Sequence, residues 1–538
     1  MVTKPANIRK QHIACQNGGK TMRGFSEKIH LILNTPTEED AKGDRERILD
    51  ALNAQGYAPV LMEFSVLRTL YPLCRDASFD ITVTLIWCED FYRLTRIESG
   101  DTTAMHYALA ADLGSTTIAM ELVDMNSGCV LASANDANKQ RACGDDILTR
   151  MIYAKDHPEH LHKLHNAALA SFEALFQKLE ADSGIAVHDC SVLIVSGNTT
   201  MIHFLLELDP WVIFSSPYAP VACNPGFLSA SEIGFSSFMG ITYIVPAIAN
   251  YLGGDITSGL LTTDFYKKDG LSAFFDIGTN GELILGNRDF MLAGAGAAGP
   301  ALEGGISKSG MRATDGAINS VKIEKAALTF TTIGHALPVG ICGSGIIDLL
   351  AQMRLNGWVD ISGKLNPDAS PRIQYIREIE EYAAIYASGS ESANGTDLYF
   401  SQTDIMQYLD TKAAAHTMVD CLLDSAGFTK DDLTAFYTSG AFGTYTDLES
   451  AITIGIFPDL PRSAFHCLGN SSLAGARTLL LDRSRMKDIR MFQETIYYVQ
   501  FASIPDFLIR MQASKFIPHT DLSQYPSVVR ALEEHHIH

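Results

Sequence analysis

Two stretches of the chain share one layout, and they decide how the rest of the sequence is interpreted. Residues 108–117 read ALAADLGSTT, and residues 273–282 read AFFDIGTNGE. In each stretch an apolar run typical of a buried strand ends at an aspartate, Asp112 or Asp276, and a glycine follows two residues later. The two aspartates are 164 residues apart. A repeat of this length indicates duplicated domains, because solenoid repeats span only about 20–50 residues.

The segments after the two turns also correspond. Two further strands are expected after the first turn, over 118–123 and 130–134, and two after the second, over 282–285 and from Phe290 onward. Later, each half places an apolar strand before a helix twice. The sequence therefore predicts an α/β fold in which each half reads β-β-β-α-β-α-β-α, with three antiparallel strands followed by parallel crossovers.

Composition shifts and turn residues suggest how the chain divides. A compact α/β pattern with a thin core precedes the first half, and a polar segment precedes that pattern. The predicted parts are a loose tail (1–25), a small α/β domain (26–103), a first half (104–268), a second half (269–515) with an insertion near 317–401, and a C-terminal tail (516–538).

Charge and hydropathy exclude several classes of function. The 538 residues include 41 Lys and Arg against 62 Asp and Glu, which gives a net charge of −21. A nucleic-acid groove or a polybasic membrane surface needs clustered Lys and Arg, so neither is expected. No run approaches the ~20 apolar residues of a membrane span, and the N-terminus lacks the apolar segment of a secretion signal. We expect a cytoplasmic protein that binds neither nucleic acid nor membranes.

The two Asp-x-Gly turns suit a nucleotide. Glycine lets the backbone approach a ligand closely, and the residues around it offer amide and hydroxyl donors to phosphate oxygens. Aspartate suits Mg²⁺, usually through water. One such aspartate alone is more often a cap or turn residue, but two in matching positions favour one nucleotide held between two halves. The phosphate-binding residues expected on this basis are Gly114, Ser115, Thr116, Thr117, Gly278, Thr279, Asn280 and Gly281, with Asp112 and Asp276 as catalytic residues that hold Mg²⁺ through water.

Two further groups of residues are candidates for the same site. Residues 438–443 form a glycine-rich turn after an expected strand and fit an adenosine contact through Gly440, Ala441, Phe442 and Gly443. Asp145 and Asp146 open an expected helix after Gly144. They are either a helix cap and a first-turn acid or catalytic carboxylates that orient the attacking water, and the residues alone leave both interpretations open.

These motifs resemble those of the ASKHA superfamily, which includes actin, the heat-shock chaperone ATPases, and the acetate and sugar kinases. Residues 112–117 are similar to its first phosphate motif, 276–282 to its second, and 439–443 to its adenosine motif. Residues 247–259 and 469–476 resemble its two connecting helices, which cross at a hinge. The resemblance implies that the two halves are duplicated ribonuclease-H-like (actin-like) domains preceded by the small α/β domain.

Within the superfamily the motifs look like those of the reductive activators of corrinoid-dependent methyltransferases. The matching segments are 195–201, 275–282, 298–304, 310–313, 340–345, 442–443, 447–452 and 457–461. The resemblance implies further nucleotide contacts at Gly197, Asn198, Thr199, Gly299 and Glu303. Ser439, where glycine is usual, and Lys308-Ser309 depart from the family pattern, which bears on individual nucleotide contacts but not on the class.

What the resemblance implies for function is an ATPase that drives an uphill electron transfer onto an inactive cob(II)alamin cofactor. Its cofactors would be ATP and Mg²⁺, and its partner a corrinoid protein or the corrinoid-dependent methyltransferase. Such activators usually carry an iron–sulfur domain with closely spaced cysteines. Here only Cys15 precedes the small domain, and the nearest cysteines in sequence are 14 residues apart. No iron–sulfur cluster is therefore expected. The chain would either work beside a separate ferredoxin-like electron donor or only remodel the corrinoid site.

Two other functions stay open at this point. One is a small-molecule kinase of the acetate or sugar kinase type, which would need an acceptor pocket and a catalytic base. The other is a non-catalytic chaperone for a corrinoid protein that uses ATP as a conformational ligand. The sequence also leaves the oligomeric state open, a homodimer included.

Overall fold

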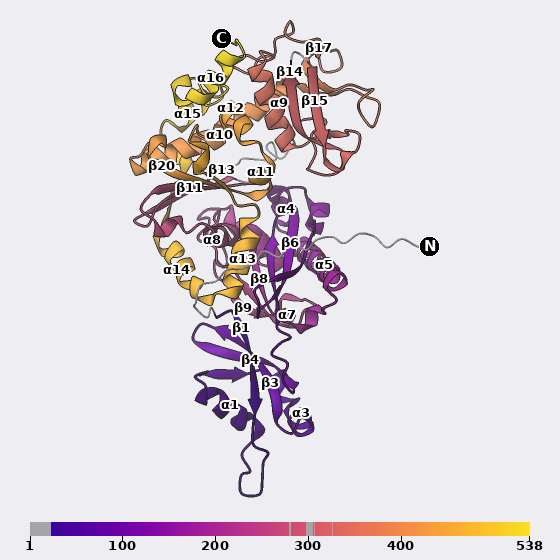
Figure 1. Cartoon of the computed structure of the whole chain (residues 1–538), viewed down its shortest axis with the longest axis vertical. Helices are drawn as coiled ribbons and strands as arrows, with labels where there is room; N and C mark the ends of the chain where they lie inside the picture. The colour runs from indigo at the N-terminus through magenta and orange to yellow at the C-terminus, as the bar shows by residue number, and fades with distance from the viewer. Residues whose placement is uncertain (1–22, 279–280, 297–304, 306, 325–326, 538) are drawn as a thin grey trace.

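The computed structural model describes residues 23–278, 281–296, 305, 307–324 and 327–537. Figure 1 shows an elongated molecule with a small sheet domain at one end, two larger α/β bodies in the middle, and additional strands at the other end. Each of the two middle bodies is built on a six-stranded sheet. No helix in this described part of the chain is long and apolar enough to cross a membrane.

The first half has the strand order β7-β6-β5-β8-β10-β9. β5, β6 and β7 are antiparallel neighbours, and β8 and β10 add in parallel. Its elements are β5 (Tyr107–Leu113), β6 (Thr117–Asp124), β7 (Val130–Ala137), α4 (Ile147–Ala154), α5 (Pro158–Ser183), β8 (Cys190–Gly197), α6 (Thr199–Leu205), β9 (Gly226–Ser229), α7 (Ala230–Ile233), β10 (Ile241–Ile244) and α8 (Gly254–Leu260).

The second half repeats this order as β21-β20-β11-β12-β13, with β22 added beside β13. The duplicated α/β fold predicted from the sequence is thus confirmed. Its elements are β11 (Leu271–Ile277), β12 (Gly281–Gly286), β13 (Met291–Gly296), α10 (Gln402–Ala426), β20 (Leu433–Ser439), α11 (Gly440–Tyr445), α12 (Leu448–Ile454), β21 (Phe465–Cys467), α13 (Ser471–Leu481), α14 (Met486–Thr495), β22 (Ile496–Tyr498) and α15 (Phe507–Ala513).

The central strand β5 has a core on each face. Leu109 and Ala111 belong to a core shared with α5, whereas Ala108 and Ala110 belong to a core shared with α8 and α13. Phe274 of β11 lies in this second core too. A strand buried on both faces reads as a continuous apolar run rather than as an alternating one, and this explains the apolar stretch before Asp112. The two connecting helices are therefore packed between the halves.

Residues 317–401 form two three-stranded sheets and the helix α9 (Gly343–Leu355). One sheet has the order β15-β14-β16 and the other β17-β18-β19. The strands are β14 (Ala317–Glu324), β15 (Ala327–Thr332), β16 (Gly340–Ile341), β17 (Ile373–Ile376), β18 (Glu381–Ala387) and β19 (Leu398–Ser401). They share one large core with the outer face of the second half, at the end of the molecule remote from the small domain (Figure 1).

The small domain is a four-stranded sheet in the order β1-β3-β4-β2 with its helices packed on it. Its elements are β1 (Ser26–Ile32), α1 (Asp44–Ala54), β2 (Val60–Met62), α2 (Phe64–Leu67), α3 (Leu70–Asp76), β3 (Asp80–Cys88) and β4 (Phe91–Ser99). Residues 64–76 form two short helices, α2 and α3, rather than one continuous helix. Pro72 explains the break, because its ring clashes with the carbonyl of residue 68 in a continuous helix.

Both predicted tails need correction where they are described. Residues 1–22 of the N-terminal tail lie outside the described part of the chain, but Phe25 is fully buried in the core between the halves. The segment 516–538 carries the helix α16 (Pro526–Glu534). Its Tyr525, Val528 and Leu532 are buried in the core of the second half. Apolar residues at helical spacing hold this segment against the second half.

Candidate nucleotide site

A cavity of about 500 Å³ lies between the two halves, at the carboxyl ends of β5 and β11. In a sheet with parallel strands, ligands bind at this edge, where the loops diverge. The predicted residues that line it are Asp112, Gly114, Ser115, Thr116, Thr117, Asn198, Asp276, Gly278 and Gly440. Lining residues that were not predicted include Asn135, Asp255, Glu282, Tyr445, Asn470 and Ser472.

Asp112 is held from across the cavity by the other half. Ser472 donates a hydrogen bond to Oδ1 of Asp112 at 2.7 Å, and Asn470 Nδ2 donates to Oδ2 at 2.8 Å. Both donors stand in the first turn of α13, where Asn470 also caps the helix through Leu473. Burial raises the pKa of the Asp112 carboxyl, and the two hydrogen bonds act against that shift.

Asp276 is held from within its own half. A hydrogen bond from Ser439, at the end of β20, reaches its carboxylate. Ser439 in turn shares a hydrogen bond with Ser471 at 2.6 Å between their hydroxyl oxygens. Burial, together with the charge of Asp112, raises the pKa of Asp276 to about 6. The serine that departs from the family pattern is therefore a direct partner of a predicted metal ligand.

A third carboxylate, Asp255 on the first turn of α8, faces the same cavity. Burial and the charges of Asp276 and Asp112 raise its pKa. Neighbouring carboxylates in a cavity repel one another and disfavour their own ionised forms. None of the described residues that line the cavity is Lys or Arg. A divalent cation with oxygen ligands would relieve this repulsion, so the donor set fits Mg²⁺.

The first phosphate turn is tight because it contains Gly114. A Cβ on this residue would lie 2.4 Å from the backbone oxygen of Thr117, so only glycine fits. Asn138 braces the turn by donating from Nδ2 to the Gly114 carbonyl at 2.9 Å and from its backbone N–H to the Thr116 carbonyl at 2.9 Å. The turn therefore keeps its shape independently of the other half.

The two connecting helices, α8 and α13, cross beneath the cavity. A Cβ on Gly475 would lie 1.9 Å from the Ser258 carbonyl oxygen, so the backbones touch at this point. Ser196 of β8 hydrogen-bonds to both helices, through Ser258 at 2.7 Å and Ser472 at 2.8 Å. This buried hydroxyl chain ends at Asp112 and joins the crossing point to the carboxylate.

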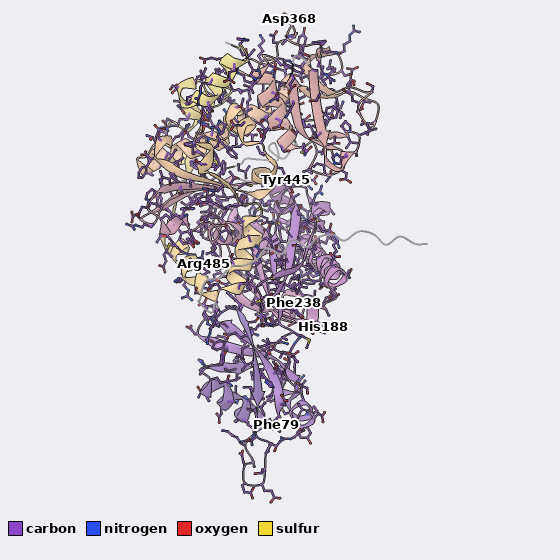
Figure 2. All side chains as sticks on the ribbon, viewed as in Figure 1. Phe79, His188, Phe238, Asp368, Tyr445 and Arg485 are labelled. Carbon is purple, nitrogen blue, oxygen red and sulfur yellow. The ribbon has the colours of Figure 1, made fainter. Side chains whose placement is uncertain are left out.

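The third turn begins the short helix α11. Gly440 lines the cavity with a φ of 85°, a conformation that favours glycine. Gly443 lies in the same helix, and its carbonyl accepts a hydrogen bond from the Cys467 thiol; the side chains of Ala441 and Phe442 are not among those described. Figure 2 shows Tyr445, at the end of α11, where the two halves meet. Tyr445 is 68% exposed and lies at the cavity wall.

Several other predicted site residues lie away from the cavity wall. Asp146 is the N-cap of α4 and accepts from the Thr149 backbone N–H at 2.8 Å, and Asp145 is exposed and paired with Arg141. Of the two interpretations of this pair, the structure supports the cap. Gly197 and Gly281 are buried beside the lining residues Asn198 and Glu282, and Thr199 begins α6. The remaining predicted residues, Thr279, Asn280, Gly299 and Glu303, lie outside the described part of the chain.

Three family models match consecutive parts of the chain. They are the RACo linker region over residues 20–104, the RACo middle region over 107–268, and the C-terminal domain of RACo, the ASKHA domain, over 270–529. Together they span both halves and the small domain.

Individual proteins give the same result. The chain is 30% identical over 528 residues to the corrinoid activation enzyme RamQ of Eubacterium limosum, covering 93% of this chain and 88% of that protein. It is 25% identical to the [Co(II) methylated amine-specific corrinoid protein] reductase of Methanosarcina barkeri, over 71% of each chain. A solved reductive activator for corrinoid, iron–sulfur protein matches with a TM-score of 0.85 and 35% identity, over 94% of this chain and 81% of that one.

Proposed function

The chain belongs to the RACo family, and from that premise we propose that it binds Mg-ATP between its two halves and uses it to activate a corrinoid protein. The observation that carries the proposal is the cavity, in which Asp112, Asp255 and Asp276 meet the turn 114–117 and Gly278. The relatives that match nearly the whole chain are a corrinoid activation enzyme and a reductive activator. Residues 270–529 of the chain match the C-terminal domain of RACo, the ASKHA domain.

Different residues of the cavity would contribute to different parts of phosphoryl transfer. When bound, Mg²⁺ would neutralise charge on the phosphate oxygens. Asp112 and Asp276 would hold its hydration shell, and the backbone amides of 114–117 would bind phosphate oxygens. Asp255 is placed in the cavity, unlike Asp145 and Asp146, and would orient the attacking water. Little further chemistry is needed from the protein, because this reaction depends on positioning and charge compensation.

Domain movement would connect the nucleotide to the partner. The two halves touch the cavity from opposite sides, so a nucleotide that contacts both binds the closed arrangement better than the open one. Such a ligand shifts the equilibrium by its difference in affinity between the two arrangements. A bound corrinoid protein would be moved or distorted by that closure, which would favour transfer of an electron to its cobalt.

We further propose that the electron comes from a separate iron–sulfur protein. In the described residues all nine cysteines are free, and they do not gather into a group of three or more. A cluster needs several thiolates brought together. Iron and sulfide in stoichiometric amounts after anaerobic purification would contradict this part of the proposal.

The proposed function is tested with purified protein, Mg-ATP, and a Co(II) corrinoid protein from the same methyltransferase system. We expect ATP hydrolysis that requires Mg²⁺, and an ATP-dependent change of the corrinoid absorption spectrum toward Co(I) when a low-potential donor is supplied. ATP turnover that depends on a small-molecule acceptor, with no change of the corrinoid spectrum, would identify a kinase instead. Binding of ATP without turnover would identify a chaperone.

A further inference from the structure

One helix reaches both the nucleotide cavity and the small domain. α13 has 11 residues, which corresponds to about 16 Å. Figure 1 shows it running from the meeting point of the halves toward the small domain. In Figure 2, Tyr445 marks the cavity and Arg485, shortly after the end of α13, lies nearer to the small domain.

The start of α13 is bonded directly to Asp112 and reaches Asp276 through Ser439. Asn470 and Ser472 donate to the two oxygens of Asp112 at 2.8 and 2.7 Å, and Ser471 reaches Asp276 through the hydroxyl of Ser439. Both hydrogen bonds to Asp112 bridge the halves. Any shift of α13 along or about its axis therefore changes how this carboxylate points into the cavity.

The C-terminal end of α13 is hydrogen-bonded to the segment that leads into β1, and a residue just beyond the helix contacts the small domain. The Leu480 carbonyl accepts from the Phe25 backbone N–H at 3.0 Å. Arg483, just beyond the helix, donates to Glu27 at 3.0 Å and to the Tyr92 hydroxyl at 3.0 Å. Its guanidinium also lies 5.2 Å from the centre of the Trp87 ring. This side chain is 13% exposed, so its contacts are largely shielded from water.

The middle of α13 is restrained sideways rather than free. Gly475 touches Ser258 of α8 directly. Arg477 donates twice to Glu121 of β6, at 2.7 Å to each carboxylate oxygen. A helix that is packed on its sides and bonded at both ends transmits displacement as a rigid element, because interiors packed at this density do not deform continuously.

We propose that Asn470 and Ser472 are positioning residues for Asp112, and that α13 makes their placement depend on the small domain. The inference rests on the proposed function and adds its regulation: a partner that displaces the small domain would change the Mg²⁺-dependent part of nucleotide affinity. Because such coupling is reciprocal, Mg-ATP would equally change the affinity for that partner.

The test measures ATP affinity by calorimetry with saturating Mg²⁺ and again with EDTA, in five single variants of the full chain. Ser472→Ala removes a donor to Asp112, and Arg483→Gln loosens the contact with the small domain. Thr478→Ala is the matched control on the same helix, since among the described residues its hydroxyl bonds only to the Ala474 carbonyl. Arg372→Gln is the matched control for loss of an arginine, since it breaks a pair with Glu391 in the β17–β19 region.

We expect Ser472→Ala and Arg483→Gln each to weaken Mg-ATP binding about fivefold to tenfold while leaving the affinity for metal-free ATP unchanged. A general loss of structure would lower both affinities. Ser472→Thr keeps the hydroxyl and is expected to restore most of the Mg²⁺ effect. The two controls should match the unchanged chain.

The outcomes separate this inference from the function on which it rests. If the unchanged chain binds no Mg-ATP, the proposed function fails. If the unchanged chain binds Mg-ATP, and Arg483→Gln shows the same Mg²⁺ dependence of ATP affinity, the inference alone is overturned. The position of the small domain would then not affect Asp112 through α13. If Ser472→Ala behaves like Thr478→Ala, Ser472 is not a positioning residue.

Discussion

The two halves of the molecule have the same sheet order but differ in what is attached to it. Each begins with three antiparallel strands, and each first strand ends in an aspartate at the cavity. Between the third and fourth strands, the first half has α4 and α5, whereas the second has two additional sheets as well as α9 and α10. What the halves share faces the cavity, and what distinguishes them lies away from it. The chemistry is therefore expected from the shared part.

The two aspartates are held differently in spite of this symmetry. Asp276 has its partner Ser439 in its own half, whereas both oxygens of Asp112 accept hydrogen bonds from residues of the other half. The helix that holds Asp112 comes from the second half of the sequence but packs against β5, β6 and β8 of the first half. The duplicated site is symmetric in its residues and asymmetric in the way its two carboxylates are held.

The largest expected effect comes from the two aspartates themselves. Asp112→Asn and Asp276→Asn keep the side-chain volume but remove the charge that holds hydrated Mg²⁺. We expect each to lower Mg²⁺-dependent ATP hydrolysis about 100-fold or more, because a metal contributes several kcal/mol to stabilising charge in such reactions. Steady-state rates at saturating Mg-ATP provide the measurement.

Asp145→Asn is the control for this pair, since Asp145 is exposed and paired only with Arg141 among the contacts described. It should retain the rate of the unchanged chain. If Asp145→Asn lowered the rate of ATP hydrolysis as much as Asp276→Asn does, the carboxylates at the start of α4 would be catalytic. If either Asp112→Asn or Asp276→Asn hydrolysed ATP at the rate of the unchanged chain, the two aspartates would not contribute equally to the reaction.

The second comparison is between the connecting helices. An alanine Cβ at Gly475 of α13 would lie 1.9 Å from a backbone oxygen, whereas at Gly259 of α8 it would lie 2.7 Å from the Ser471 hydroxyl oxygen and 2.9 Å from Phe274. A hydroxyl can rotate away, but a backbone carbonyl cannot. We expect Gly475→Ala to lower the free energy of unfolding by about 3 kcal/mol and Gly259→Ala by about 1 kcal/mol. Urea unfolding measures both, and equal losses would contradict the crossing geometry.

Acid should lower the free energy of unfolding through a histidine that lies where the first half meets the small domain. His106 is 5% exposed and hydrogen-bonded to Ser26 of β1, and burial lowers its pKa from 6.5 to about 4. The unfolded chain therefore binds the proton more readily than the folded one, so the stability contribution is complete above pH 6.5 and is lost as the pH falls toward 4. Between pH 7.5 and 5 this amounts to about 2 kcal/mol.

His106→Asn removes this group while keeping a polar side chain. Unfolding free energies of the variant and the unchanged chain, taken at pH 7.5 and pH 5, should differ in their pH dependence by that amount. His416, buried in the second half with a lowered pKa, stays in both proteins and cancels in the comparison. Parallel pH profiles would show that His106 is not kept neutral by burial.

The smallest expected effect concerns the binding of the adenine base of ATP. The exposed ring of Tyr445 at the cavity wall is suited to stack on adenine, and one such contact contributes about 1–3 kcal/mol. Tyr445→Ala should weaken ATP binding about fivefold to tenfold but leave the binding of inorganic triphosphate unchanged. Competition calorimetry distinguishes these results, and equal weakening of both ligands would exclude stacking on the base.

Local signals predicted much of the fold and part of the site. The apolar runs that end at Asp112 and Asp276 identified two central strands and two turns. The residues that indicate the strand, the turn and the class of ligand all lie within about ten positions of one another. The resemblance of residues 247–259 and 469–476 to connecting helices likewise predicted α8 and α13. A cap such as Asp146 is a local feature too, yet its sequence alone fitted a catalytic acid equally well.

The unpredicted residues depend on contacts between distant segments. Asn470 and Ser472 reach Asp112 across 358 and 360 residues, and nothing near them in sequence marks them as more than a helix start. Asp255 resembles an ordinary first-turn acid until α8 places it beside two other carboxylates. The packing of α8 and α13 against distant strands decides these contacts, and no local pattern encodes it. The Gly253-Gly254-Asp255 sequence at the start of a connecting helix was the one available signal for Asp255.

The central claim is that carboxylates from both halves hold one hydrated divalent cation together with the nucleotide. Mn²⁺ prefers the same oxygen ligands as Mg²⁺ and is observed directly by electron paramagnetic resonance. Titrating the protein with Mn²⁺ in the presence of ATP should remove the free-ion signal at one ion per chain, and an Asp112→Asn, Asp276→Asn double variant should leave only binding to ATP in solution. Identical titrations for the double variant and the unchanged chain would contradict the account.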